Sequence, residues 1–128
     1  MENFSVTLTI DGLPSTSALG EAIAKSVSAG TTLGLVGTLG AGKTYLSQAI
    51  AVACGVPSSE ATSPTFVLCH VYHADRTIYH LDAYRMADDD EFIELGVEEM
   101  FASDGLTLVE WADRVESVLP RNRITIEI

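Results

Sequence analysis

The stretch GLVGTLGAGKTYLSQAI, residues 34–50, contains the residues whose types and spacing point most directly to chemistry. Gly37, Gly42, Lys43 and Thr44 fit the pattern G-x-x-x-x-G-K-[ST] of a phosphate-binding loop. Glycines let the backbone curl with its N–H groups toward a phosphate, the lysine adds a compact positive charge, and the threonine hydroxyl is a ligand for Mg²⁺. The motif therefore predicts a site for a nucleoside triphosphate with magnesium, such as ATP.

The context of the motif agrees with this chemistry. It lies between the apolar run TTLGLVG and a helical pattern over residues 43–53, which is the strand–loop–helix order that such loops need. The alternative is a glycine-rich turn with a solvent-exposed lysine. We expect the nucleotide to contact Thr38, Leu39, Gly40, Ala41, Gly42, Lys43, Thr44 and Tyr45, with Lys43 also acting in catalysis.

Hydrolysis also needs acidic groups near the phosphates, and two acids end apolar runs. Asp82 ends TIYHLD, and Glu110 ends LTLVE. In a parallel sheet both runs bring their acids to the carboxyl edge, where the loop also lies. We expect one acid to hold Mg²⁺ or its water shell together with Thr44, and the other to orient the attacking water. Alternatively, one of them caps a helix or pairs with Arg85 or Arg114.

Thr65 and Trp111 are further candidates for the same site. Thr65, in SPTF, follows the first helix after the loop, where a threonine in P-loop nucleotidases can sense the γ-phosphate and magnesium. The alternative is a threonine that begins a strand after the turn residue Pro64. Trp111 directly follows Glu110 and is either a core residue or an exposed contact beside the site.

The histidines and cysteines give no comparable pattern. His70, His73 and His80 fall on one expected hairpin, where His70 and His80 can lie across from each other. No cysteine or acid completes a convincing zinc set with them. Cys54 and Cys69 are too far apart for a zinc ligand pair or a disulfide framework, so we expect both to be small buried hydrophobic residues.

Periodicity and turn residues indicate the elements that would position this chemistry. We expect a strand at Phe4–Ile10, a helix capped by Ser15 or Thr16 and stopped by Gly30, a central strand in TTLGLVG, a helix over residues 43–53, a hairpin within TFVLCHVYHADRTIYHLD turning at residues 74–76, one or two short helices in ADDDEFIELGVEEMF, and strands at LTLVE and RITIEI. The expected fold is therefore α/β and P-loop NTPase-like: a mainly parallel sheet with flanking helices and an antiparallel hairpin. Residues 1–128 are expected to form a single P-loop ATPase domain.

Composition narrows the function classes. The chain has 128 residues, 47% of them hydrophobic, and a formal net charge of -11. This charge repels a polyanion, so we do not expect the chain to bind nucleic acid on its own. No apolar run approaches the roughly 18 residues that cross a bilayer, and the N-terminus lacks a basic leader with an apolar core. We expect a cytoplasmic protein that does not bind membranes.

The motifs GTLGAGKT, SPTF, YHLDAYR, ELGVEE and LVEWADR, in that order, resemble the TsaE family, formerly YjeE, of small bacterial P-loop ATPases. The resemblance implies an ATPase that binds two larger partner proteins, of TsaB and TsaD type, in tRNA threonylcarbamoyladenosine biosynthesis. Those proteins modify the adenosine beside the anticodon in tRNAs reading codons that begin with A, and tRNA would contact this chain only indirectly. The resemblance also implies that Thr65 is a switch-like threonine and that Asp82, Glu110 and Trp111 form the active-site and interaction set.

Two departures from the family pattern stand out. Thr38 replaces a usual aspartate and Ala83 a common leucine, so we expect small differences in loop charge and packing. Family members also continue into one further strand, so we expect either a short sequence or a barer sheet edge at Ile124, Ile126 and Ile128.

Two other functions compete with the partner-dependent ATPase. One is a small-molecule or nucleotide kinase, which is disfavoured because such enzymes use several arginines in a lid and few arginines exist here. The other is a nucleotide-gated binding module without useful catalysis. The presence of Lys43, Thr44, Asp82 and Glu110 together argues against that inactive site.

Overall fold

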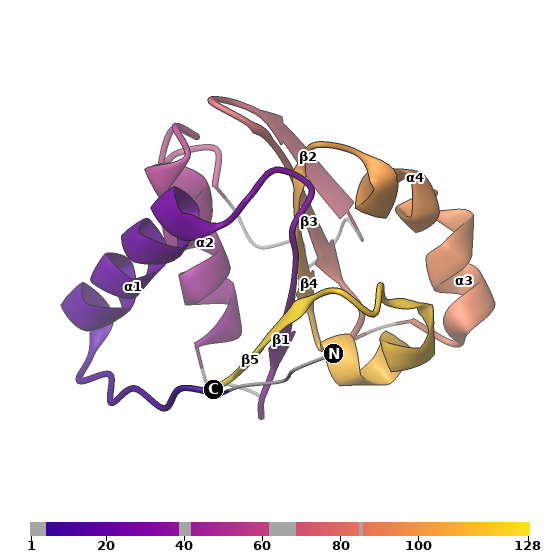
Figure 1. Ribbon diagram of the computed structural model, residues 1–128, viewed down its shortest axis with the longest axis horizontal. Helices are drawn as coiled ribbons and strands as arrows, with labels where there is room; N and C mark the ends of the chain where they lie inside the picture. Colours follow the sequence, from indigo (N-terminus) through magenta and orange to yellow (C-terminus); the bar gives the residue numbers. More distant parts are fainter. Residues whose placement is uncertain (1–4, 39–41, 62–68, 85) are drawn as a thin grey trace.

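The fold was derived from a computed structural model that describes residues 5–38, 42–61, 69–84 and 86–128 (Figure 1). The elements in chain order are α1 (Leu13–Ser26), β1 (Thr32–Val36), α2 (Lys43–Ala53), β2 (Cys69–His73), β3 (Thr77–Asp82), α3 (Asp89–Glu94), α4 (Val97–Ala102), β4 (Leu106–Glu110), the 3₁₀ segment η1 (Ala112–Val118) and β5 (Ile124–Glu127). None of the helices among these residues is both long and apolar enough to cross a membrane.

The strands form one five-stranded sheet in the order β2-β3-β4-β1-β5. The β3–β4, β1–β4 and β1–β5 pairs are parallel, and β2 and β3 form an antiparallel hairpin. The expected α/β fold with a mainly parallel sheet and one hairpin is therefore confirmed. Strand β1 lies inside the sheet and is buried along most of its length, as its apolar run without alternation predicts.

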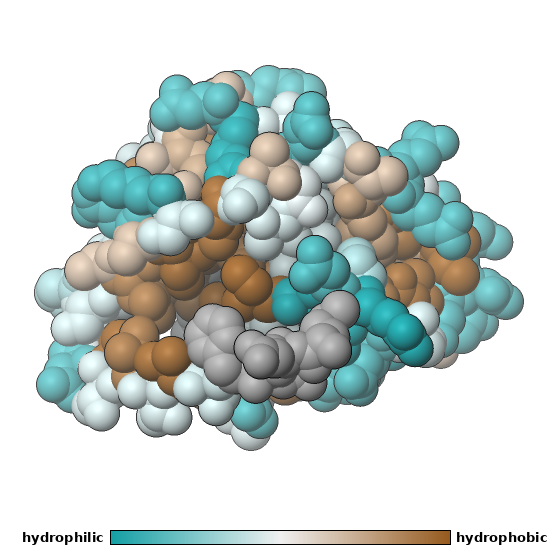
Figure 2. All heavy atoms as spheres, in the orientation of Figure 1, coloured by the Kyte–Doolittle hydropathy of each residue, from teal (hydrophilic) through white to brown (hydrophobic). Residues whose placement is uncertain are grey.

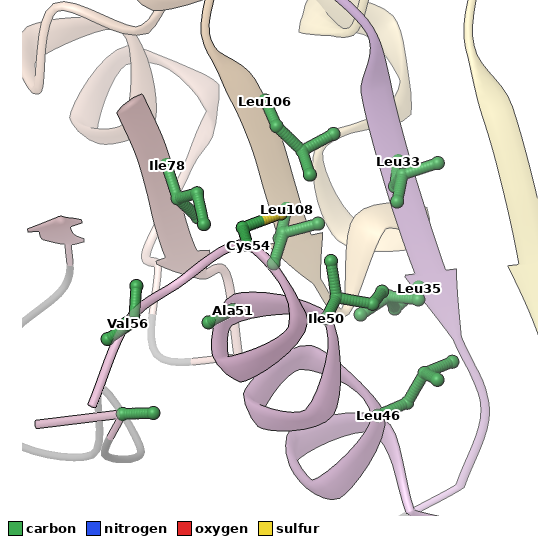
Figure 3. Close-up of a cluster of buried hydrophobic side chains, with 11 residues drawn as sticks. Leu33, Leu35, Leu46, Ile50, Ala51, Cys54, Val56, Ile78, Leu106 and Leu108 are labelled. Atoms are coloured by element: carbon green, nitrogen blue, oxygen red, sulfur yellow. The ribbon is translucent and has the colours of Figure 1, made fainter. Parts of the chain in front are cut away.

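Helices cover both faces of the sheet. Figure 1 shows α1 and α2 on one face and α3, α4 and η1 on the other. The core between α2 and the sheet contains Leu46 and Ile50 of α2 against Leu33, Leu35 and Leu108 of the strands (Figure 3). A second core, which includes Leu81, Phe92, Val97 and Val109, lies on the other face. Hydrophilic residues gather at the periphery of the molecule around more hydrophobic ones (Figure 2).

The N-terminal strand predicted at Phe4–Ile10 is wrong for the residues that the structure describes, since residues 5–10 form no strand and Phe4 lies outside the described residues. Val6 and Leu8 are 72% and 60% exposed. Their alternating pattern is typical of a half-buried strand, but a strand also needs a neighbour for its backbone hydrogen bonds. In the described part of the chain, residues 5–10 have no such ladder.

The predicted cap of the first helix is also wrong. Helix α1 begins earlier, at Leu13 after Gly12, because Pro14 fits the first turn, where its missing N–H is not needed. The hydroxyl of Thr16 then donates to the Gly12 carbonyl at 3.1 Å from within the helix. The helix ends at Ser26, before Gly30 with its φ of +80°.

The other predicted elements agree with the structure. Helix α2 has the expected bounds, the β2–β3 turn occupies residues 74–76, and the acidic segment forms two short helices. The Asp88 side chain caps α3 by accepting from the Glu91 N–H at 2.9 Å. Strand β5 forms a sheet edge, on which Ile124 is 46% exposed; Ile128, just beyond it, is 43% exposed.

Candidate active site

Strand register brings the two predicted acids and the phosphate-binding motif to one edge of the sheet. Asp82 and Glu110 are direct partners across the parallel β3–β4 pair. Leu35, two residues before Gly37, is the partner of Glu110 across the β1–β4 pair. The end of β4 therefore lies between the end of β3 and the start of the loop, as parallel topology requires.

The start of α2 has the features that an anion site needs. Gly42 takes a left-handed conformation, φ 105° and ψ 13°, and no side chain caps the helix. A residue with a Cβ is disfavoured in that conformation, which accounts for glycine at this position. The uncapped N–H groups and the helix dipole favour a phosphate at this end of α2.

Lys43 lies folded against the loop. Its Nζ donates to the carbonyl oxygens of Gly37 at 2.8 Å and Thr38 at 2.7 Å, and the residue is only 4% exposed. The ammonium group is thus held beside the loop rather than in solvent, contrary to the alternative of an exposed lysine. Leu39, Gly40 and Ala41 lie outside the described residues. The Tyr45 hydroxyl forms a hydrogen bond with the Ser17 hydroxyl of α1 at 3.1 Å.

A chain of polar contacts connects the partly buried Thr44 with the buried Glu110 and His80. The Thr44 hydroxyl donates to Oε1 of Glu110 at 2.6 Å, and Nε2 of His80 lies 2.5 Å from Oε2 of the same carboxylate. Glu110 is 2% exposed and His80 is 1% exposed. Each oxygen of the carboxylate therefore has a partner from another element, which fixes the orientation of the group.

Asp82 lies in a different environment. It is partly exposed, and its Oδ1 accepts the Tyr84 N–H at 2.9 Å, which stabilises the turn after β3. The contact lies within a turn and caps no helix, since α3 begins at Asp89 with Asp88 as its cap. In the described part of the chain the second oxygen has no protein hydrogen-bond donor, so it can accept from water. Arg85 lies outside the described residues.

Aromatic and cationic side chains form a rim beside the two acids, made of Trp111, Tyr84 and Arg114. The Lys43 Nζ lies 3.9 Å from the centroid of the Trp111 ring. The Tyr84 and Trp111 rings are 4.8 Å apart, and the Arg114 guanidinium lies 4.8 Å from the Tyr84 ring. Trp111 also has a left-handed backbone, φ 58°, which is unusual for a bulky residue and is a feature of constrained sites. Trp111 is half-buried, so both interpretations of it apply in part.

The β2–β3 hairpin next to the site is partly buried. His70 and His80 are register partners, as expected, and burial lowers the pKa of His70, with the charge of His80 lowering it further. Cys54 is buried, as predicted, but Cys69 is only partly buried. Burial nevertheless raises the pKa of the Cys69 thiol to about 11.

The donor atoms present fit Mg²⁺ with a nucleotide. Mg²⁺ prefers oxygen ligands and keeps several waters and phosphate oxygens of its own. The Thr44 hydroxyl and the Glu110 carboxylate supply adjacent oxygens below the loop. The described residues contain no group of three or more His, Cys, Asp or Glu side chains suited to a metal ion. A metal here would thus depend on nucleotide and water for its remaining ligands.

A model of the family described as "Threonylcarbamoyl adenosine biosynthesis protein TsaE" matches residues 11–128. The chain belongs to the TsaE family. It is 37% identical over 113 residues to the tRNA threonylcarbamoyladenosine biosynthesis protein TsaE of Treponema pallidum, covering 88% of this chain and 83% of that protein. The TsaE protein of Bacillus subtilis is 39% identical, with 88% of this chain and 70% of that protein covered.

The structural comparison agrees with the TsaE assignment. The crystal structure of YdiB from Bacillus subtilis has a TM-score of 0.76 at 34% identity and covers 92% of this chain and 72% of that chain. The family match includes the loop, both acids and the rim residues. The resemblance found in the sequence motifs and the fold class expected from them are therefore confirmed.

His80 lies in the motif YHLDAYR, but the sequence pattern raises it only as a candidate for a zinc site and predicts no role for it beside Glu110. The available signal was its position two residues before Asp82, which places both side chains on the same face of β3. Thr65, the predicted switch residue, lies outside the described residues and stays a prediction.

Proposed function

We propose that this chain is a Mg²⁺-dependent ATPase that acts in the biosynthesis of tRNA threonylcarbamoyladenosine. Membership of the TsaE family supports the role in this modification. The observation that supports nucleotide hydrolysis most directly is the Thr44–Glu110 contact at 2.6 Å beneath the start of α2. It places a hydroxyl and a carboxylate together where a P-loop protein needs oxygen ligands for magnesium.

Each residue of the site has a separate role in this proposal. The N–H groups of the loop and of α2 bind the phosphates, and Lys43 neutralises charge on them. Thr44 and Glu110 hold the metal, which when bound polarises the phosphate oxygens. Asp82, at the wetter strand end, accepts a hydrogen bond from the attacking water and orients it. Trp111 lies against Lys43 and limits how far the ammonium can move.

Partner proteins complete the activity. The net charge of -11 opposes direct contact with tRNA, so we propose that partners of TsaB and TsaD type bind the tRNA. Arg114, the described arginine nearest the site, is stacked on the Tyr84 ring. With few arginines to stabilise charge on the γ-phosphate, we expect slow hydrolysis by the chain alone and faster turnover in the assembly.

The test measures ATP binding and turnover for the chain alone and with the two partner proteins. We expect binding that strengthens with Mg²⁺, slow turnover alone, and a clear increase with partners. Thr44→Val, which removes the hydroxyl while keeping the shape, should remove the effect of Mg²⁺. Absence of ATP binding, or turnover in EDTA equal to that in Mg²⁺, would exclude the proposed function. Tight tRNA binding by the chain alone would contradict the partner-dependent part.

A further inference from the structure

We propose that His80 is a positioning residue of the magnesium site. Through its Nε2–H it holds the Glu110 carboxylate in the orientation in which Glu110 and Thr44 can bind the metal. This inference rests on the proposed function, because it concerns the same site. It adds a residue that neither the phosphate-loop motif nor the strand-end acids identify.

The contacts of the Glu110 carboxylate are the basis for placing a proton on Nε2 of the His80 ring. Nε2 of His80 lies 2.5 Å from Oε2 of Glu110, and the two side chains are 2% and 3% exposed. In this proposal Glu110 is an ionised carboxylate, which can only accept hydrogen bonds, so Nε2 is the donor. The other oxygen, Oε1, accepts from the Thr44 hydroxyl at 2.6 Å. The carboxylate is therefore held between a strand residue and a helix residue, with one donor on each oxygen.

The backbone keeps His80 in place. Strand β3 lies between β2 and β4, and His80 is paired with His70 on one side and Leu108 on the other. Partners across a ladder share a face of the sheet, and Leu108 belongs to the core that packs against α2 (Figure 3). The imidazole therefore extends into the layer of α2, which carries Thr44. A rigid strand thus supplies the donor.

Removing this donor should weaken the metal site selectively. Oε2 would be left without its partner in a dry interior, where an unpaired polar atom is costly, so the carboxylate would turn and the Thr44 contact would change. Residues that orient metal ligands are typically worth about 10–100-fold in metal affinity or activity. Lys43 contacts the loop through Gly37 and Thr38, so nucleotide binding without metal should be preserved.

The experiment titrates Mg²⁺ into each variant with a non-hydrolysable ATP analogue. Binding is followed by the fluorescence of Trp111, the only tryptophan in the chain. His80→Leu removes the donor, whereas His80→Gln keeps an N–H at a similar distance from the backbone. We expect His80→Leu to raise the half-saturating Mg²⁺ concentration by about 10–100-fold, with analogue affinity in EDTA within about twofold of the parent. His80→Gln should recover much of the loss.

His73→Gln is the matched control, because His73 lies on the same hairpin but is exposed. It should keep the parent's Mg²⁺ midpoint. An unchanged midpoint in His80→Leu, with normal binding by the parent, would overturn the role of His80 alone. A parent that binds no analogue, or binds it without regard to Mg²⁺, would overturn the proposed function and this inference together.

A second measurement covers the case in which both His80 variants fail to fold. Two-bond ¹H–¹⁵N correlation spectra of the parent report which ring nitrogen of His80 carries the proton. We expect a protonated Nε2 whose resonance shifts when Mg²⁺ is added to the analogue-loaded parent. An unprotonated Nε2, or a resonance that does not respond to Mg²⁺, would overturn the proposal.

Discussion

Asp82 and Glu110 face each other at the ends of neighbouring strands, yet their side chains lie in different surroundings. Glu110 is 2% exposed, and each of its oxygens has a hydrogen-bond partner, one from α2 and one from β3. Asp82 is partly exposed, and its Oδ1 accepts a hydrogen bond from the backbone N–H of Tyr84 in the adjacent turn. Two carboxylates that are register partners thus lie in different environments. That of Glu110 is buried and held by hydrogen bonds, whereas that of Asp82 is accessible to water.

This difference in burial is the basis for proposing different roles for the two acids. A buried carboxylate with both oxygens bound is oriented before any ligand arrives, which suits a residue that holds a metal. Asp82 is more exposed, and one of its oxygens has no protein donor among the described residues, which suits a residue that orients water. We therefore propose that Glu110 binds the metal and that Asp82 orients water, a choice that the sequence prediction left open.

Glu110→Ala should produce the largest effect, because it removes the buried carboxylate and both of its hydrogen bonds. The change leaves the Thr44 hydroxyl and the His80 imidazole without their shared acceptor. We expect the free energy of unfolding to fall by about 3 kcal/mol, as for other broken buried pairs, and ATP turnover to fall to background. Urea unfolding and a phosphate-release assay measure the two losses. The control is Glu116→Ala, since Glu116 is exposed and its ion pair with Arg123 is long, at 3.4 Å. Parent-like stability in Glu110→Ala would show that the buried contacts contribute little.

Lys43→Ala should remove most of the stabilisation by ATP. A ligand that binds only the native state at 100 times its Kd stabilises the protein by about 2.7 kcal/mol. Without the ammonium group, we expect most of the ATP-induced shift in Tm to disappear. The control is Lys25→Ala, because Lys25 is the only other lysine and is exposed in an ion pair with Glu21. An equal Tm shift in Lys43→Ala and the parent would refute the phosphate-loop assignment.

Asp82→Asn tests the role of the partly exposed carboxylate. The amide oxygen can still accept the Tyr84 N–H, so we expect the free energy of unfolding to stay within about 0.5 kcal/mol of the parent. The neutral group cannot orient water in the same way, so turnover should fall by about 100-fold, within the range for general-base residues. Denaturation and turnover are compared with those of Asp104→Asn, which changes an exposed acid elsewhere. If Asp82→Asn lost stability as Glu110→Ala does, the two acids would not differ as proposed.

The sequence predicted most of this arrangement because the signals are local. An apolar run, glycines at fixed spacing and a helical pattern predict β1, the loop and α2, and acids after apolar runs predict Asp82 and Glu110. Parallel topology then places these segments together. Each inference needed only a short window of sequence.

The features that the sequence did not predict depend on distant partners. His80 resembles any polar residue in a strand, and its partner Glu110 lies 30 positions away. The segment at residues 5–10 has the alternation of a strand, but alternation does not reveal whether a sheet edge is available. The left-handed backbone of Trp111 likewise has no signature in residue type, because aromatic residues rarely adopt it.

We expect the smallest effects from changes to the rim, which we propose as the contact surface for the partner proteins. Tyr84 is 40% exposed and packs against the Trp111 ring in a tilted arrangement, whereas Trp111 also lies against Lys43. Tyr84→Ala should therefore reduce the increase in turnover caused by the two partner proteins, by about 10-fold if Tyr84 acts as an interface anchor. Trp111→Ala should reduce that increase and also the turnover of the chain alone, by about threefold, because a cation–π contact is worth about 0.5–1 kcal/mol.

Turnover is measured for both variants with and without partners, beside Val71→Ala, which removes an exposed apolar side chain from the outer strand β2. The two rim variants should differ in the unstimulated rate, since Lys43 lies against the Trp111 ring, and they should agree in the loss of stimulation if both rings contact a partner. Equal stimulation of Tyr84→Ala and the parent would place the partner contact elsewhere. In that case, Asp82 at the exposed end of β3 would orient water without any contribution from a partner protein.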